Sequence, residues 1–327
     1  MNKSFVSPLL GIASCVIIIL FGASHPLETL QSLFTDTFTS RYYFGNMLNT
    51  AAFLMIAGTG SAIAIRSGNM NLGGEGQVYI GGFTGCIILN VMKGPVSVVF
   101  IAALFASAAS GAIMATFSAL LKELRGAKVL LTTFLFSAAV IPLVDGFITA
   151  SKKSSETNML ALPYIDDAYK MKQWLSPSPL TASFVLAIIV CILAWHLMYK
   201  TDFGRKMSIW GTAPLFARYC GYSSAINSSI TLAASGALHA LTGFFAVTGT
   251  YYTCHKGFYT NMGWNALNVA LIAKSNPLTA IPTSIVLSWL FTSASRVSLT
   301  QGFSFDIAGI VQGIILFSIA IPRRRSS

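Results

Sequence analysis

Residues 95–121 read PVSVVFIAALFASAASGAIMATFSALL, a run without a single Asp, Glu, Lys or Arg. About 18 apolar residues in helical conformation suffice to cross the hydrocarbon core of a bilayer, so this stretch predicts a membrane-spanning helix. Comparable runs fill most of the chain, and we expect spans at about 8–23, 44–65, 78–92, 95–121, 128–149, 181–199, 227–250, 264–274, 276–293 and 305–321. The sequence therefore predicts an all-α, polytopic bundle of about 8–10 transmembrane segments that forms one transmembrane domain over residues 1–327.

The composition excludes the main soluble classes. Hydrophobic residues make up 54% of the chain and charged residues 9%, whereas soluble domains carry about 25% charged residues. The net charge of +11 comes from Lys and Arg scattered through short connections, not from a basic face, so we expect lipid and no nucleic acid around this protein. The cysteines lack metal or disulfide spacing, and we expect no metal and no cofactor; the five are Cys15, Cys86, Cys191, Cys220 and Cys254.

The positive charges predict the orientation of the chain. Ten spans place both termini on one side, and putting that side in the cytoplasm leaves 13 of the 21 Lys and Arg there, as the positive-inside rule favours. The segments 264–274 and 276–293 are short and are separated by Asn276 and Pro277. One alternative is a hairpin that enters and leaves by the outer face, in addition to eight full spans. Both counts predict the same orientation.

Residues 66–77, RSGNMNLGGEGQ, are the most unusual part of the sequence. We expect Gly73, Gly74 and Gly76 to interrupt a helix. Interrupted backbone at membrane depth occurs where protein or a water-filled cavity surrounds it, as in many transporters. At that depth Glu75 needs a partner or a cavity. The alternative is an ordinary cytoplasmic turn with a solvated Glu75.

The loop 200–226 predicts a short cytoplasmic helix. Pro214 is typical of a first helical turn, Thr212 of a cap before it and Gly221 of the end. This helix would present Leu215, Phe216 and Tyr219 with Arg218, a combination that suits the groove of another protein. A linker that packs under its own bundle is the alternative.

Two outer segments and one packing stripe complete the expectations. The loop 150–180 carries Lys152, Lys153, Lys170, Lys172, Glu156, Asp166 and Asp167, and it is either a docking surface or a plain connector. The stretch 25–43 is expected at the outer interface. Small residues in 102–119, including Ala106, Ser110 and Gly111, predict close helix packing.

Several ordered motifs together resemble one family. NLGGEGQ (71–77), TDFGR (201–205), ARYCG (217–221), SGALHALTG (235–243), VAL (269–271) and NPL (276–278) occur in this order. Over roughly 45–320 the chain resembles the permease subunits of ABC importers for simple sugars and nucleosides, which belong with the branched-chain amino acid and ribose permeases.

This resemblance implies a subunit of a bacterial inner (cytoplasmic) membrane that performs no chemistry itself. Its implied partners are a cytoplasmic ABC ATPase, a second permease subunit, homologous or identical, and an extracytoplasmic substrate-binding protein. The helix that would couple to the ATPase comprises Gly211, Thr212, Ala213, Pro214, Leu215, Phe216, Ala217, Arg218, Tyr219 and Gly221. We assign to the solute pathway Asn69, Asn71, Gly73, Gly74, Glu75, Gly76, Gln77, His239, Asn265 and Asn268.

The solute and the energy source have alternatives. His239 and the WNALN stretch at 264–268 depart from the family pattern. A nucleoside or related compound is the expected solute, with riboflavin or a simple sugar as the alternative. His239 itself is either a proton or substrate group, or a neutral histidine that hydrogen-bonds across helices. A secondary transporter driven by an ion gradient is the rival from another class, with Glu75 and His239 as its only serious coupling residues.

Overall fold

The fold is an assembly of helices with no strand in the part of the chain that the structure describes. The structure is a computed structural model, and it describes residues 3–151, 159–303 and 305–320. The longer helices are α1 (Lys3–Gly22), α2 (Pro26–Thr39), α3 (Arg41–Arg66), α4 (Gly74–Val91), α5 (Val96–Arg125), α6 (Val129–Ala150), α7 (Ser183–Lys200), α8 (Asp202–Thr212), α10 (Ser224–Ala246), α11 (Met262–Ile272), α12 (Pro277–Thr300) and α13 (Ile307–Ala320). The short elements are η1 (Asp167–Tyr169), α9 (Pro214–Tyr219) and η2 (Val247–Tyr251), the last continuing α10.

The predicted all-α membrane architecture is confirmed. Each of the ten expected spans coincides with a helix, and six described helices are long and apolar enough to cross a membrane: α3, α5, α6, α7, α10 with η2, and α12. The first charged residue after the 95–121 run, Lys122, still belongs to α5, which ends at Gly126 in the left-handed conformation.

The length of α12 favours a full crossing over the outer-face hairpin considered for 264–293. α12 has 24 residues, about 36 Å of helix, which is enough to cross the bilayer. Its C-terminal half lies beside the start of α3, where the Arg296 guanidinium carbon is 4.9 Å from the Tyr43 ring centroid. The turn at 273–276 therefore lies toward the other end of α3, the end that carries Arg66. α11 has only 11 residues and follows the irregular segment 252–261, so this crossing is a half-length helix.

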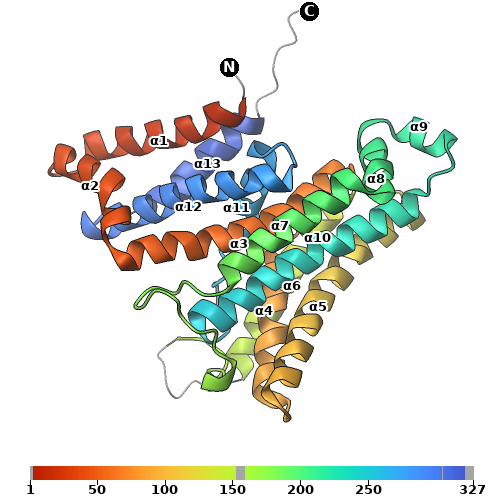
Figure 1. Cartoon of the computed structure of the whole chain (residues 1–327), viewed down its shortest axis with the longest axis horizontal. Helices are drawn as coiled ribbons and strands as arrows, with labels where there is room; N and C mark the ends of the chain where they lie inside the picture. Colours follow the sequence, from red (N-terminus) through yellow and green to blue (C-terminus); the bar gives the residue numbers. More distant parts are fainter. Residues whose placement is uncertain (1–2, 152–158, 304, 321–327) are drawn as a thin grey trace, which may run out of the picture.

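α3 runs through the middle of the molecule (Figure 1). In the view of Figure 1, α1, α2, α12 and α13 lie to one side of it and α4 to α6 to the other, while α8 and α9 lie beyond the end of α7. Residues 51–62 of α3 are buried without a break. Four of the five cysteines are buried and all five are free thiols, so the buried four pack as small apolar side chains.

Close backbone contact joins α4, α5 and α10. A Cβ built on Gly111 of α5 would lie 2.3 Å from the Gly236 carbonyl oxygen of α10, and one on Gly243 would lie 1.9 Å from the Val78 carbonyl oxygen of α4. No larger residue fits at such separations, as is common where membrane helices associate through small residues. The predicted close packing of α5 is confirmed at Gly111, although the fully buried stripe runs through Ala103, Ser107 and Ala115.

α2, which is not among the candidate spans, is held to the C-terminal part of α12 by polar contacts. The Asp36 carboxylate lies 2.5 Å from a guanidinium nitrogen of Arg296 and also accepts a hydrogen bond from Ser32 Oγ at 2.8 Å. Thr37 Oγ1 and Ser293 Oγ are 2.7 Å apart in a second, buried contact. The Ser32 hydrogen bond and the Arg296 charge together hold the pKa of Asp36 below its usual value.

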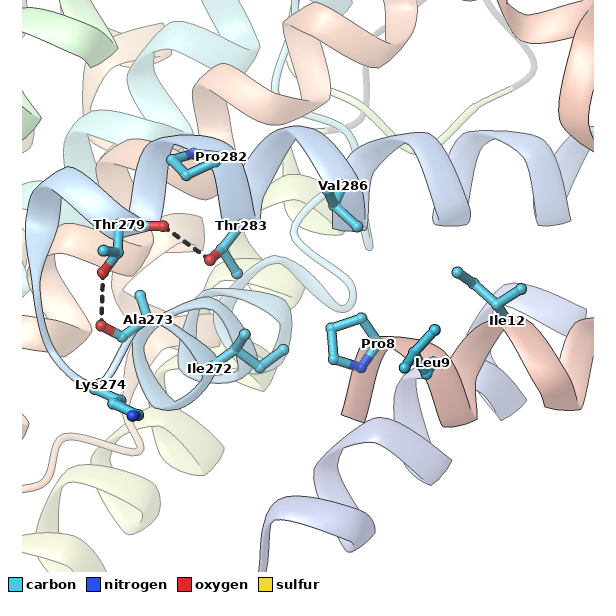
Figure 2. A pocket seen from close by; sticks show the side chains of 10 residues that line it. All are labelled: Pro8, Leu9, Ile12, Ile272, Ala273, Lys274, Thr279, Pro282, Thr283 and Val286. Carbon is cyan, nitrogen blue, oxygen red and sulfur yellow. Dashed lines mark hydrogen bonds between the residues drawn. The ribbon is translucent and has the colours of Figure 1, made fainter. Parts of the chain in front are cut away.

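A groove between α1, α11 and α12 is mainly apolar. It has a volume of about 520 Å³ and is lined by Pro8, Leu9, Ile12, Ile272, Ala273, Lys274, Thr279, Pro282, Thr283 and Val286. Figure 2 shows that its two threonines already donate to backbone carbonyl oxygens, Thr279 to Ala273 at 2.7 Å and Thr283 to Thr279 at 2.8 Å. The groove therefore offers few free polar groups to a solute.

Candidate functional site

The connection between α3 and α4, residues 67–73, is the interrupted backbone that the sequence predicts, but its glycines act differently from expectation. The break lies before Gly74, and Gly74 and Gly76 belong to the first turn of α4. A Cβ on Gly76 would lie 2.7 Å from Ser137 Cα, and one on Gly74 would lie 3.0 Å from Gly263 Cα. These two glycines let α6 and α11 approach the start of α4 and do not interrupt a helix.

Asn71 and Gln77 close this connection with a reciprocal amide pair. Asn71 Nδ2 donates to Gln77 Oε1 at 2.9 Å, and Gln77 Nε2 donates to Asn71 Oδ1 at 3.1 Å. Asn71 Nδ2 also donates to Ser235 Oγ of α10 at 3.0 Å, and the Gly73 N–H donates to Asn71 Oδ1 at 2.9 Å. Both side chains are buried, and their polar atoms bind other parts of the chain.

Asn69 binds α5 and α10 at the same connection. Its Oδ1 accepts from the Lys122 ammonium at 2.8 Å and from Ser228 Oγ at 3.3 Å. Lys122 also donates to Ser228 Oγ at 2.7 Å. An ammonium held by neutral oxygens is fixed in place without an ion pair, so this lysine at the end of α5 is part of the framework around residues 67–73.

Glu75 lies against the start of α11. Its Oε1 accepts the backbone N–H of Gly263 at 2.9 Å and of Trp264 at 3.2 Å, and Glu75 is 9% exposed. Among the described residues it forms no ion pair. The carboxylate therefore accepts hydrogen bonds from N–H groups that have no partner within α11, and its charge lies at the positive end of the α11 dipole. The alternative of a cytoplasmic turn with a solvated Glu75 is wrong, because Glu75 is buried.

His239 is fully buried between α10 and α3. Its Nδ1 lies 2.7 Å from the Ser235 carbonyl oxygen and its Nε2 lies 3.2 Å from Ser61 Oγ. Both ring nitrogens thus have a partner inside the protein, and one bond crosses to another helix. This geometry corresponds to the second interpretation of His239, a hydrogen bond across helices.

Asn265 and Asn268 differ from the other polar residues of this region. They lie one turn apart on α11, and Asn268 is fully buried while Asn265 is half-buried. Among the described residues, neither amide atom of Asn268 has a hydrogen-bond partner, and neither does Oδ1 of Asn265. A buried amide without a partner costs about 1–3 kcal/mol. A polar molecule that hydrogen-bonds to Asn265 and Asn268 would remove this cost.

An aromatic cluster lies beside the first third of α4. Tyr79, one turn after Glu75, donates to Asp145 Oδ1 at 2.6 Å. Its ring centroid is 4.4 Å from that of Tyr259 and 5.6 Å from that of Phe258, and Asp145 is also 3.7 Å from Lys256. The sequence does not predict this cluster, because its members come from three distant segments.

The predicted cytoplasmic helix exists as α9, with a second helix, α8, before it. Pro214 occupies the first turn and Gly221 follows the end in the left-handed conformation, as expected. The predicted Thr212 cap is wrong, because Thr212 ends α8 and its hydroxyl donates to the Ser208 carbonyl oxygen. Leu215, Phe216 and Tyr219 are 74%, 58% and 91% exposed, so an apolar face is available on α9.

α8 was not predicted from the sequence, although its start carries a usable signal. Thr201 accepts the Gly204 N–H on its hydroxyl, and Asp202 follows in the first turn. Both are typical of a helix N-terminus. Gly204 lets α8 lie against the end of α7, since a Cβ there would be 2.3 Å from the Leu197 carbonyl oxygen.

The outer loop is described only in part, because Lys152, Lys153 and Glu156 lie outside the described residues. Lys170 contacts Asp167 at 2.5 Å and lies 5.1 Å above the Tyr252 ring, whereas Lys172 is exposed. Backbone hydrogen bonds join this loop to 252–256, for example Ile165 N–H to the Tyr252 carbonyl oxygen at 2.9 Å. The described part of the loop is thus fixed to the segment that follows α10 and η2.

Comparison with known proteins gives consistent matches over the whole length. Residues 43–320 match the family model described as "Branched-chain amino acid transport system / permease component". The chain is 28% identical to a probable riboflavin import permease protein of Treponema pallidum, over 97% of this chain and 85% of that protein. It is 22% identical to a guanosine ABC transporter permease protein of Bacillus subtilis, over 96% and 91% of the two chains.

One solved structure has a similar fold. The chain superimposes on a chain of PsaBC from Streptococcus pneumoniae, solved in complex with a Fab, with a TM-score of 0.50. The match covers 89% of this chain and 94% of that chain at 13% identity. It supports the helical architecture described above.

Proposed function

Since the chain belongs to the family of branched-chain amino acid transport system permease components, we propose that it is the membrane-spanning subunit of an ATP-driven importer for a nucleoside or a related ring-bearing compound. It catalyses no reaction of its own. ATP is hydrolysed by a separate cytoplasmic ATPase, and this chain moves the solute by changing which side of the membrane its pathway opens to.

One observation carries the location of the pathway. α11 is a half-length helix whose N-terminus is bound by the Glu75 carboxylate. Among the described residues, both amide atoms of Asn268 and the Oδ1 of Asn265 have no hydrogen-bond partner. Transporters often place the solute at such a discontinuous helix. We therefore assign only Glu75, Asn265 and Asn268 to the solute pathway. The other polar side chains expected there hydrogen-bond within the protein; these are Asn69, Asn71, Gln77 and His239.

The ring system of the solute is supported by two findings. The two relatives above are named for riboflavin and guanosine, and both compounds combine a flat ring with hydroxyl groups. In this chain Tyr79, Tyr259 and Phe258 lie together within one turn of Glu75. Aromatic faces stack on flat rings, and amide groups would bind ring nitrogens or hydroxyls. Riboflavin or a simple sugar remains the second candidate.

Three partner proteins complete the proposed importer: an ATPase, a second permease subunit and a substrate-binding protein. The ATPase would receive α9 in a groove, with both chain termini on the same cytoplasmic side. A second permease subunit, homologous or identical, would complete the pathway. A substrate-binding protein would dock on the outer loop, which carries the exposed Lys172. The expected location is the inner membrane of a bacterium.

Transport by the reconstituted complex tests the proposal. Vesicles that contain the permease pair, the ATPase and the binding protein should take up labelled guanosine when ATP is supplied, and vanadate should stop this uptake. Riboflavin and ribose serve as competitors that identify the solute class. Uptake driven by an ion gradient without ATP would refute the proposal and favour a secondary transporter.

The matched variants are Asn268→Ala and Asn227→Ala. Both are asparagines with an amide oxygen that lacks a partner, but Asn227 is near the start of α10 and its nitrogen donates to the Ser67 carbonyl oxygen. Loss of Asn268 should raise the KM for the preferred solute, whereas loss of Asn227 should not change solute preference. Equal effects on preference would contradict the assignment of α11.

A further inference from the structure

Arg66, the last residue of α3, binds both α7 and α8. Its Nε donates to Ser208 Oγ of α8 at 2.7 Å, and its Nη1 donates to the Tyr199 hydroxyl of α7 at 2.7 Å. The guanidinium carbon also lies 4.0 Å from the centroid of the Tyr199 ring. A lysine cannot form this arrangement, because it needs a planar group with donors in two directions.

The backbones of α3 and α8 touch beside this side chain. A Cβ on Gly211 of α8 would lie 2.1 Å from the Arg66 carbonyl oxygen. Gly68 has φ of 76°, and a Cβ there would lie 3.1 Å from Gly211 Cα. α8 therefore rests directly on the first residues of the 67–73 connection.

The same connection is fixed to four other helices. Asn69 binds Lys122 of α5, and the Ser67 carbonyl oxygen accepts Asn227 Nδ2 of α10 at 3.2 Å. Asn71 binds Gln77 of α4. Leu72 N–H donates to Thr133 Oγ1 of α6 at 3.1 Å. A displacement of α8 at Arg66 would thus also displace residues 67–73, and these residues contact α4, α5, α6 and α10.

α9 follows α8 after the single residue Ala213. A force on α9 consequently reaches α8 without a flexible linker. We infer that Arg66 is the positioning residue that transmits movement of the α8–α9 pair to the 67–73 connection, and that this connection relays it to the helices around the solute pathway. Asn69, Asn71 and Gln77 then serve the relay and do not bind solute. The inference rests on the proposed function, since it supplies a step within ATP-driven import.

The test measures solute transported per ATP hydrolysed by the reconstituted complex. Arg66→Met removes both hydrogen bonds and the ring contact. Arg205→Met is the matched control, because Arg205 lies on the same helix pair, is exposed and pairs only with Asp202 among the described residues. Ser208→Ala removes one of the two Arg66 bonds with the smallest change of shape. Pull-down of the ATPase and the thermal stability of the complex are measured for every variant.

We expect Arg66→Met to assemble with the ATPase and to hydrolyse ATP while uptake per ATP falls at least tenfold. Ser208→Ala should lower the ratio in the same direction by a smaller factor, and Arg205→Met should keep the wild-type ratio. Arg66→Lys should not restore the ratio. If Arg66→Met does not assemble, the Ser208→Ala ratio decides the question.

If Arg66→Met transports as much solute per ATP as the wild type, this inference is overturned and the proposed function is left intact. The same holds for an unchanged ratio in Ser208→Ala if Arg66→Met does not assemble. An equal fall of uptake and ATP hydrolysis would also overturn it, because a merely structural role reduces both together. A wild-type complex without ATP-dependent uptake would overturn the proposed function and this inference with it.

Discussion

Replacement of Glu75 by Leu or by Gln tests the contact between α4 and α11. Leu removes the acceptor that binds the Gly263 and Trp264 N–H groups, at 2.9 and 3.2 Å. Each buried donor left without a partner costs about 1–3 kcal/mol, so Leu should cost about 2–6 kcal/mol. Gln keeps an oxygen in the same place and loses only the charge.

The cost of the Gln variant is smaller for a definite reason. A hydrogen bond to a charged group contributes about 1.5–3 kcal/mol and a neutral one about 0.5–1.5 kcal/mol. In the Gln variant, two hydrogen bonds to a charged group become hydrogen bonds to a neutral group, at a total cost of about 2–3 kcal/mol. This cost lies in the lower half of the about 2–6 kcal/mol expected for Leu. The two variants should therefore differ by up to about 3 kcal/mol, which is a factor of up to about 150 in an equilibrium.

The assay is uptake by reconstituted vesicles at equal permease levels, together with thermal unfolding of the purified chain in detergent. We expect Leu to reduce uptake far more than Gln and to unfold at a lower temperature. Glu123 provides the control, because it is exposed at the end of α5 and its one hydrogen bond within the described part of the chain is from Ser224, at 2.8 Å. Glu123→Leu should leave both measurements close to wild type. Wild-type uptake by both Glu75 variants would refute the reasoning.

Three further outcomes are expected. Leu215→Asp with Phe216→Asp should abolish recovery of the ATPase in a detergent pull-down, because burial of these two exposed side chains contributes about 2–4 kcal/mol; full recovery at equal permease levels would contradict the coupling role of α9. Lys172→Glu should weaken transport at low concentrations of binding protein and low salt, whereas Lys170→Glu should also disturb the loop itself; identical transport by all three proteins would leave the loop a connector. Asp36→Asn should lower the thermal stability at pH 7. Because the folded pKa of Asp36 lies below its unfolded value, the difference from wild type should shrink once the pH falls below the unfolded pKa of about 4 and should vanish below the folded pKa; a difference that does not shrink at all with falling pH would exclude this explanation.

The sequence predicts most of the helices because their signal is local. The apolar run of 95–121 is longer than a bilayer requires, and every expected span contains a helix. α8 was missed because it is short and lies in a polar stretch between two spans. The cap at Thr212 was misplaced for the same reason, since a helix that was not predicted ends on that residue.

The site could be predicted only as a list of unusual residues. The partner of Glu75 is a helix N-terminus 188 positions away, and the partner of Asn69 is a lysine at the end of another span. Neither pairing leaves a pattern in one sequence, because both depend on which helices lie side by side. Composition likewise cannot separate Asn71, whose amide is fully paired, from Asn268, whose amide is not.

The glycine contacts among α4, α5 and α10 limit how this protein changes shape. At Gly111 and Gly243 one helix touches the backbone of another, so rotation or sliding of either helix would drive backbone atoms into each other. We therefore expect the three helices to move together. A change of shape is then expected where α3, α11 and α12 pack through larger side chains that can repack, such as Leu54, Ile272 and Leu287.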